Sequence, residues 1–396
     1  MQINLDLNIF SIALIAVSAV ITIFFVFFYR RTINRVSRKY ASCQADETIG
    51  NDLPSLSVVV FSHGTADNLT NALHSILSQY YTSHFEVIVV ADGRSEHIED
   101  VVKVFSAVNK NIRFTYVPDD AHNLSRKKLA LTLGIKAAKY DYVFLTDGEI
   151  ATDSTDWLAR MSRHFIEKRI GMVVGMSRLV NEEGEMSAAF SPQTFDYLMN
   201  NVEWLSAAIK RRTYRCSIVN MAFRKELFFN IRGFADSLNL HNGEDDIFVS
   251  NLAQKTNVEI EISSDAQIEY RCYDLKSTYT NLKINRLFTG KYVRRTTPLY
   301  FGLASASMWL WLFSLIASLT PSWPDIFPGL IILGLGLIWM ILITLTWKKA
   351  SKSLKIKCNA WLLPFNMFYH PFYNIRFKIK ARFHRSRNFT WSRPLK

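Results

Sequence analysis

The chain has 396 residues, of which 47 are Lys or Arg and 34 are Asp or Glu, and 49% of its residues are hydrophobic. This length suffices for one sizeable core with attachments, and the apolar content is high for a soluble enzyme, so membrane segments are expected. The four cysteines lack metal-ligand spacing, which argues against a zinc site and a disulfide framework; they are Cys43, Cys216, Cys272 and Cys358.

Three uncharged stretches of 22 residues each are long enough to cross about 30 Å of hydrocarbon. They are Asn8–Tyr29, Leu299–Thr320 and Ile326–Trp347, and we predict a transmembrane helix over each. The first stretch has the alternative of a secretory signal peptide, but its leader carries Asp6 and no positive charge, which favours an anchor. Basic flanks place the N-terminus and the PSWPD turn (321–325) outside, and the remainder in the cytoplasm.

The spans divide the chain into six segments. We predict a transmembrane anchor (1–30), a basic and polar linker (31–54), a main domain (55–273), an amphipathic interfacial segment (274–298), a transmembrane helix pair (299–347) and a basic aromatic cytoplasmic tail (348–396). The tail holds 13 Lys and Arg and no acid, so the net charge of +13 lies there. Its interleaved aromatic residues favour an anionic membrane surface over nucleic acid as its partner.

Short apolar runs, mostly separated by helical stretches, follow one another through the main domain. They are Leu56–Phe61, Phe85–Val90, Ile112–Val117, Tyr142–Leu145 and Met172–Met176. Strands that alternate with helices predict an α/β fold with a mainly parallel sheet. No glycine fingerprint follows the first run, so a dinucleotide-binding domain is not expected.

Carboxylates follow two of these runs. Asp147 and Glu149, with only Gly148 between them, come directly after the fourth run, and Asp92 follows the second. Ligands of open α/β sheets gather at the carboxyl ends of strands, where two acids can hold a divalent cation or simply be solvated. For Asp92 a turn and a contact to a ribose or base are both open.

Three further charged groups are candidates for binding or chemistry. Lys127 and Lys128 fall in the first turn of a predicted helix, where a phosphate or carboxylate could need neutralising, although a solvated face also explains them. Three successive acids, Glu244 to Asp246, begin another predicted helix and exceed what a cap needs. Arg286 lies in the amphipathic basic segment and faces either lipid phosphate or substrate phosphate.

The order of these motifs, over about 56–295, resembles a family 2 glycosyltransferase with a GT-A fold, a Rossmann-like mixed and mainly parallel sheet. The motifs are SVVV, QYYTSHFEVIVVADGRS, KKLALTLGIKAAKYDYVFLTDGE, NMAFRKELFFNIRGF and GEDDIFV, followed by a basic segment. Bacterial membrane-bound members share this plan of anchor, catalytic domain and helix pair. The resemblance implies that Asp92 contacts the donor nucleoside and that Asp147 and Glu149 form the metal-binding D-x-D motif.

The resemblance also implies how the transfer is catalysed. Asp245, beside Glu244 in the E-D motif, corresponds to the catalytic base, and Arg286 or Lys128 supplies positive charge to the diphosphate. Three departures from the family pattern are visible. The D-x-D motif is D-G-E, the usual N-E after the first strand is HGTAD around His63, and Q-x-x-R-W is KINRL (283–287).

A function follows from the resemblance. It implies an inverting glycosyltransferase that uses Mg²⁺ or Mn²⁺ and a nucleotide-diphosphate sugar, with a uridine diphosphate sugar favoured. The acceptor is lipid-linked or a glycan, and the enzyme is a multi-pass protein of the bacterial inner membrane, in contact with membrane lipids, with a cytoplasmic catalytic domain. No nucleic-acid partner is expected, and the sequence does not indicate an oligomeric state.

Two other classes of function stay open at this point. The three departures motivate a catalytically degenerate, transferase-like membrane scaffold, and the basic tail motivates a nucleic-acid-binding membrane protein. Only two predicted spans follow the catalytic domain. This favours single transfers over polymer translocation, which needs more membrane helices for a channel.

Overall fold

The computed structural model describes residues 9–47, 49–50, 52–119, 124–186, 191–293, 297–318 and 326–383. The chain forms two compact units. The sheet unit comprises Lys39–Ser187, Ala207–Arg294 and Phe377–Lys396, and the helical unit comprises Met1–Arg38, Ala188–Ser206 and Arg295–Arg376.

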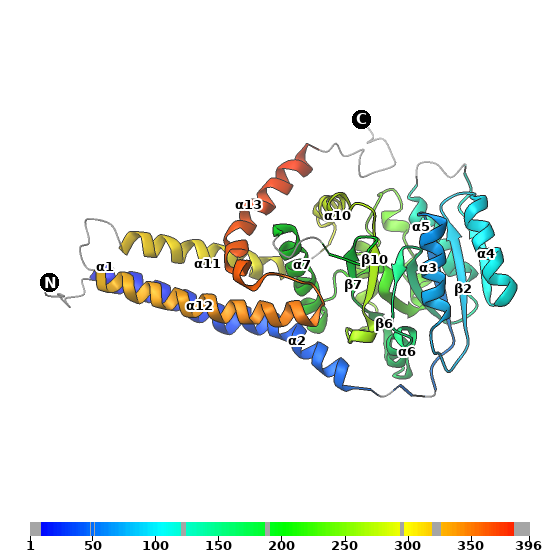
Figure 1. Ribbon diagram of the computed structural model, residues 1–396, viewed down its shortest axis with the longest axis horizontal. Coiled ribbons are helices and arrows are strands. Elements are labelled where there is room, and N and C mark those ends of the chain that lie inside the picture. Colours follow the sequence, from blue (N-terminus) through cyan, green and yellow to red (C-terminus); the bar gives the residue numbers. More distant parts are fainter. Residues whose placement is uncertain are drawn as a thin grey trace. The chain divides into compact units, whose positions relative to one another are not determined.

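A seven-stranded sheet in the order β3-β2-β1-β4-β8-β6-β9 forms the centre of the sheet unit (Figure 1). Its strands are β1 (Leu56–Ser62), β2 (Phe85–Ala91), β3 (Ile112–Tyr116), β4 (Tyr142–Asp147), β6 (Ile170–Val174), β8 (Met221–Arg224) and β9 (Asn257–Ile260). β8 is antiparallel to β4 and β6, and the other pairs are parallel. The predicted mixed, mainly parallel α/β sheet is therefore confirmed. All seven residues of β1 are buried, as its apolar run requires.

A three-stranded sheet in the order β5-β10-β7 and several helices complete the sheet unit. The strands are β5 (Ile150–Ala151), β7 (Ser177–Val180) and β10 (Ile268–Arg271). The helices are α3 (Ala66–Leu77), α4 (Glu96–Val108), α5 (Arg126–Ala137), α6 (Trp157–Ser162), α8 (Lys225–Asn230), α9 (Ile247–Ala253) and α10 (Leu275–Thr289). α5 packs on β1 and β2. Gly134 permits this close approach, because a Cβ there would collide with the side chain of Val59.

The helical unit gathers helices from distant parts of the sequence. They are α1 (Ile9–Phe24), a π-helical turn (Phe25–Tyr29), the first half of α2 (Arg30–Ala45), most of α7 (Pro192–Ile209), α11 (Thr297–Ser318), α12 (Ile326–Ser353) and most of α13 (Leu363–Arg382). α1 packs against α11 and α12. Edge-to-face aromatic pairs join Phe25 to Trp339 and Phe195 to Trp347. Most of α7 thus belongs to the helical unit, although along the chain it lies between two segments of the sheet unit.

Two of the three predicted membrane spans are long and apolar enough to cross a membrane, within Ile9–Ala45 and Pro328–Ser353. The prediction of a third span at Leu299–Thr320 is not supported. Only two candidate spans are found among the described residues; the region of the third forms helix α11, in which the described apolar stretch is Met308–Ala317. The predicted outer turn (321–325) and the basic residues 294–295 lie outside the described residues, as do positions 384–396 of the tail.

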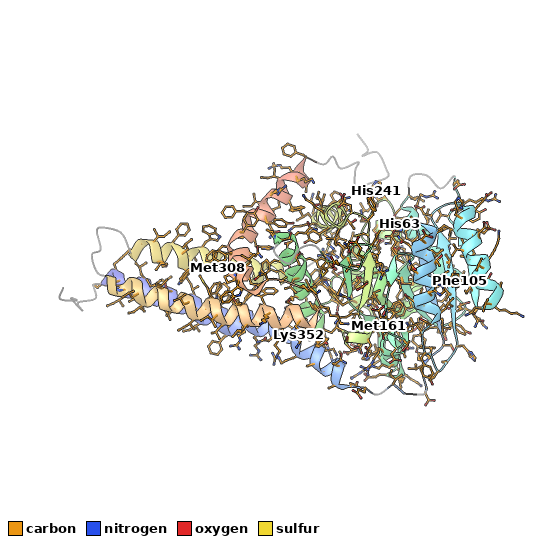
Figure 2. All side chains as sticks on the ribbon, viewed as in Figure 1. His63, Phe105, Met161, His241, Met308 and Lys352 are labelled. Atoms are coloured by element: carbon orange, nitrogen blue, oxygen red, sulfur yellow. The ribbon has the colours of Figure 1, made fainter. Side chains whose placement is uncertain are left out.

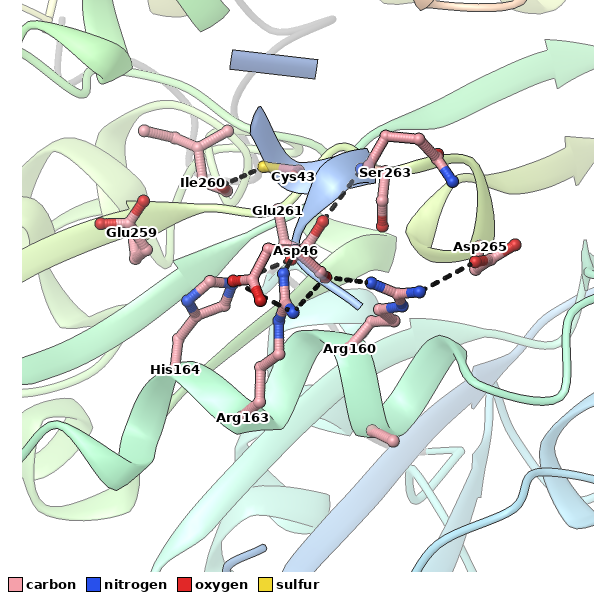
Figure 3. Close-up of polar contacts among 12 residues, drawn as sticks. Cys43, Asp46, Arg160, Arg163, His164, Glu259, Ile260, Glu261, Ser263 and Asp265 are labelled. Carbon is pink, nitrogen blue, oxygen red and sulfur yellow. Dashed lines mark hydrogen bonds and ion pairs between the residues drawn. The ribbon is translucent and has the colours of Figure 1, made fainter. Parts of the chain in front are cut away.

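The predicted linker begins as helix, because α2 continues through Ala45. The end of α2 is fixed to the sheet unit by the residues drawn in Figure 3. Arg160 and Arg163 each donate through Nη1 to the carbonyl oxygen of Asp46, at 2.6 and 2.7 Å. Arg163 also donates to the buried carboxylate of Glu261 at 2.7 Å, and Nε2 of His164 lies 3.0 Å from the same carboxylate. Several buried charge-assisted contacts therefore hold the helix end in one position.

Candidate active site

The carboxyl end of β1 lies between two acids that the sequence singles out. In the pairing of β1 with β4, Phe61 is opposite Asp147. On the other side, the backbone amide of Asp92 donates to the carbonyl of Ser62 at 2.8 Å. Asp92 and Asp147 therefore occupy the same edge of the sheet, where ligands of such sheets bind.

Asp147 is fully buried, and its two carboxylate oxygens have different neighbours. Oδ2 accepts a hydrogen bond from Nζ of Lys127 at 3.3 Å, whereas Oδ1 has no hydrogen-bond partner and lies 3.6 Å from Nδ1 of His63. Burial alone would raise the pKa of Asp147, but Lys127 and His63 outweigh it and lower that pKa below its ordinary value. Asp147 is thus a buried carboxylate anion with one oxygen left for a ligand.

His63, Asp147 and Glu149 form a group that can hold a metal ion. Each offers one ligand atom, and these atoms all lie within 4.8 Å of one another. The carboxylate of Glu149 lies directly against the backbone of Gly64, and burial raises the pKa of Glu149. The neighbouring carboxylate of Asp147 raises the pKa of His63. The side chain of His63, labelled in Figure 2, is 38% exposed, so the group is reachable from solvent.

The three acids that precede α9 have different environments. Asp246 is fully buried and caps α9, accepting from the backbone amide of Ile247 at 2.7 Å and from the hydroxyl of Thr289. Asp245 is partly exposed and accepts from Nε of Arg286 at 3.3 Å. Glu244 is buried with Oε2 unpartnered, and burial raises its pKa. Asp246 is therefore the acid that caps α9, and Asp245 and Glu244 are the two that are available for binding or catalysis.

The two neighbouring lysines of α5 point to different places. Lys127 pairs with Asp147 at 3.3 Å. Burial would lower the pKa of Lys127, but the charges of Asp147, Glu244 and Asp245 raise it. Lys128 is fully buried and donates to three backbone carbonyls. These belong to Ser237, Leu240 and Asn242, at 2.5, 3.1 and 2.9 Å. Lys128 therefore holds the loop that leads to Glu244, and Lys127 is the lysine of the site.

The structure brings most of the predicted site residues together. Ligand atoms of Asp147 and Glu149 lie within 4.8 Å of each other, Asp245 pairs with Arg286 at 3.3 Å, and Lys127 pairs with Asp147. Asp92 lies across the end of β1 and pairs with Arg126, which also donates to the carbonyl of Pro118. Lys128 is the predicted member that the structure places elsewhere.

Sequence reasoning did not assign His63 or Arg126 to the site, and it named Lys127 only as one of a pair from which Lys128 was chosen. His63 had a usable signal, since it directly follows the last residue of a buried strand, as Asp92 and Gly148 do. Lys127 and Lys128 could not be told apart without the direction of each side chain. Arg126 precedes them in the same turn, and its partner Asp92 is 34 residues away.

The donor set fits a divalent cation. Two carboxylates and an imidazole are ordinary ligands of such an ion, and the buried oxygens Asp147 Oδ1 and Glu244 Oε2 have no hydrogen-bond partner. Lys127 and Arg286 add positive charge beside these acids. This arrangement can neutralise a diphosphate and still leave a partly exposed carboxylate, Asp245, available as a base.

Comparison with known proteins relates this chain to sugar-transferring enzymes. A family model described as glycosyl transferase family 21 matches residues 11–370. Chondroitin synthase of Escherichia coli is 32% identical over 99 residues, which cover 25% of this chain and 14% of that protein. Poly-beta-1,6-N-acetyl-D-glucosamine synthase of Staphylococcus aureus (strain MSSA476) is 24% identical over 194 residues, covering 49% of this chain and 42% of that protein. The chain thus spans less than half the length of these curated relatives.

A solved structure shares the fold. The mannosyltransferase of Pyrobaculum calidifontis in complex with GDP-Man and Mn²⁺ aligns over 86% of this chain and 98% of its own, with a TM-score of 0.51 and 16% identity. This likeness supports a GT-A-like fold. The predicted resemblance to family 2 is confirmed only at the level of a glycosyltransferase, because the matching family model is that of family 21, a distinct family.

Proposed function

Because the chain belongs to glycosyl transferase family 21, we propose that it moves a sugar from a nucleotide-diphosphate sugar to a lipid-linked or glycan acceptor. A uridine diphosphate sugar is the proposed donor. The single observation that carries the proposal is the ion pair at the sheet edge between Lys127 and the buried Asp147, 3.3 Å apart, beside the candidate ligand atoms of His63 and Glu149. The mannosyltransferase with GDP-Man and Mn²⁺ supports a metal-dependent, nucleotide-sugar-using enzyme.

In this proposal each charged group has one task. Asp147 and Glu149 would hold Mg²⁺ or Mn²⁺, which would supply positive charge to the departing diphosphate. Lys127 and Arg286 add to that charge, and Asp92 contacts the nucleoside. Asp245 accepts the proton of the acceptor hydroxyl as that oxygen forms the new glycosidic bond. One displacement inverts the configuration at the anomeric carbon.

Arg286 and Asp245 form an ion pair in the structure, so the proposed base is partly neutralised. An incoming diphosphate competes for the guanidinium of Arg286, because a phosphate anion is the stronger partner for it. If the guanidinium of Arg286 pairs with the diphosphate instead, the carboxylate of Asp245 is free to accept a proton. Glu244, buried nearby with an unpartnered oxygen, is proposed to assist Asp245 in catalysis.

The proposed location is the bacterial inner membrane, with several passes and the catalytic sheet unit in the cytoplasm. The two long apolar helices, within Ile9–Ala45 and Pro328–Ser353, support membrane association. Basic residues Arg30, Arg31 and Arg35 directly follow the first of them, which supports a cytoplasmic position for the residues after it. Lipids would then surround the helical unit and lie beside the acceptor.

A donor screen tests this proposal. Full-length protein in lipid is given a panel of nucleotide-diphosphate sugars with Mg²⁺ or Mn²⁺, and the release of nucleotide diphosphate is measured with and without lipid acceptors. We expect one donor to be consumed in the presence of metal, and Asp245→Asn to lose that activity. Absence of turnover with every donor, together with no calorimetric binding of nucleotide or metal, would support a degenerate scaffold instead.

A further inference from the structure

We propose that His63 is a ligand of the divalent cation, together with Asp147 and Glu149, and that its imidazole makes the site prefer Mn²⁺ over Mg²⁺. Only the role of the bound ion, which is to neutralise the diphosphate of the donor, rests on the proposed function. Binding of the ion itself is measurable without any sugar transfer, so the two proposals fail separately.

The position of His63 follows from the sheet. β1 lies between β2 and β4, and its last residue, Ser62, is followed directly by His63. Since Phe61 is opposite Asp147 in the β1–β4 pairing, the next turn of chain carries His63 over the end of β4. The result is an Nδ1 to Oδ1 distance of 3.6 Å between His63 and Asp147.

The distances suit a shared ion. Two ligands bound to one ion at about 2.1 Å lie between about 3 and 4.2 Å apart. The three candidate ligand atoms all lie within 4.8 Å of one another, so small side-chain movements bring them into bonding range. The ring of His63 stacks on Phe61, with centroids 5.1 Å apart and planes 9° apart, which limits its orientations.

The unpartnered oxygen of Asp147 is the independent sign of a ligand. Its carboxylate is fully buried, yet Oδ1 has no hydrogen-bond partner, whereas Oδ2 accepts from Lys127. Buried carboxylate oxygens are normally satisfied, because an unmet one costs about 1–3 kcal/mol in a folded protein. An ion held between Oδ1 and the imidazole supplies the missing partner, and Lys127 does not occupy that oxygen.

The ligand chemistry then sets the preference for the ion. Mg²⁺ is bound through oxygen ligands in near-ideal octahedral geometry, which an imidazole nitrogen interrupts, whereas Mn²⁺ also prefers carboxylates but, as a first-row transition ion, binds at mixed nitrogen and oxygen sites. Two carboxylates and one imidazole therefore favour Mn²⁺. Since the side chain of His63 is 38% exposed, the diphosphate of the proposed donor would reach the site from solvent.

The decisive experiment measures Mn²⁺ alone on the full-length protein in detergent, without donor, by electron paramagnetic resonance. We expect tight Mn²⁺ binding, with Mg²⁺ at least about tenfold weaker in competition, and a ¹⁴N coupling from imidazole in the spin-echo modulation spectrum. His63→Ala should remove the ¹⁴N coupling and weaken Mn²⁺ binding about 10- to 100-fold. His63→Asp should bind Mn²⁺ again but lose most of the preference over Mg²⁺.

A matched control is His74, an exposed histidine of α3 whose ring packs on Phe105, and His74→Ala should change neither binding nor coupling. Bound Mn²⁺ without ¹⁴N coupling, unchanged affinity in His63→Ala, or no Mn²⁺ binding would each overturn the assignment. Mn²⁺ binding with ¹⁴N coupling but no turnover of any nucleotide sugar would uphold the assignment and overturn the proposed transferase function.

Discussion

Nζ of Lys127 lies 3.3 Å from Oδ2 of Asp147, and this ion pair joins the first turn of α5 to the end of β4. Lys128, the next residue, turns the other way and donates to three backbone carbonyls. Two adjacent residues of one type therefore have separate tasks. One sets the charge of the site, and the other fixes the loop that carries its acids.

The adjacent lysines give the first prediction. Lys127→Gln removes positive charge from the site, and we expect kcat/KM for the donor to fall about 100- to 1000-fold with the melting temperature little changed. Lys128→Met leaves the carbonyls of Leu240 and Asn242 without their ammonium donor, while that of Ser237 keeps the amide of Leu240, and we expect a loss of about 2–4 kcal/mol in unfolding free energy. Steady-state kinetics and thermal unfolding separate the two effects. Equal loss of stability in both variants would contradict this division of roles.

Glu149 and Gly64 give a second prediction, because a Cβ at Gly64 would collide with the carboxylate of Glu149. Gly64→Ala should displace that carboxylate and weaken Mn²⁺ binding by about tenfold, although no charge changes. Glu149→Asp shortens the side chain and retracts its carboxylate from position 64. We therefore expect the double variant to bind Mn²⁺ better than Gly64→Ala alone. Additive losses in the double variant would show that the two residues act independently.

The sheet could be predicted from the sequence, whereas the exact membership of the site could not. Runs such as Tyr142–Leu145 are apolar along their whole length, which predicts a strand that is buried on both faces. The structure agrees, because β4 begins at Tyr142. The D-G-E acids were predicted for the same reason, since they end such a run. The choice between Lys127 and Lys128 depends on side-chain direction at a helix start, which no periodicity encodes.

Residues distant in sequence explain the other differences. The pairing of Asp92 with Arg126 and the closeness of His63 to Asp147 exist only because β1 lies between β2 and β4. α2 was expected to end in a polar linker, but contacts from Arg160 and Arg163 stabilise its end. The polar composition of residues 41–45 predicts a linker, but these long-range contacts stabilise a helix there.

Glu261 gives a prediction about pH. Burial would raise its pKa, but hydrogen bonds from His164 and Ser263 and the charge of Arg163 lower it from 4.5 to about 2. A depressed carboxyl pKa stabilises the fold above the unfolded value, and this contribution is lost as pH falls from about 5 towards 2. Glu261→Gln should thus cost about 3 kcal/mol at pH 7 and much less at pH 2.

Denaturant unfolding at pH 7 and at low pH measures this difference. Asp265→Asn is the matched control, because Asp265 also pairs with an arginine of the same network, at 3.4 Å, but its side chain is 37% exposed. Exposed pairs contribute about 0–1 kcal/mol, so this control should hardly change stability at either pH. A pH-independent loss in Glu261→Gln would show that packing rather than charge accounts for its effect.

Asp245 and Asp246 provide the sharpest test of the proposed base, because they are neighbours with opposite environments. Asp245 is partly exposed and bound to Arg286, whereas Asp246 is buried among Arg215, Thr289 and the start of α9. Asp245→Asn should lower kcat about 100- to 10,000-fold, since an amide cannot accept the proton, while Mn²⁺ affinity and melting temperature stay near wild type.

Asp246→Asn should show the reverse pattern. Its neutral amide weakens the cap and the contact to Arg215, so unfolding free energy should fall by about 2–4 kcal/mol, and the remaining folded enzyme should keep kcat within about tenfold. Stopped assays of released nucleotide diphosphate, normalised to folded protein, measure both variants. If Asp246→Asn abolished turnover in fully folded protein and Asp245→Asn did not, the base would have to be reassigned to Asp246. Its buried position would then require that the acceptor hydroxyl reach it through a rearranged α9.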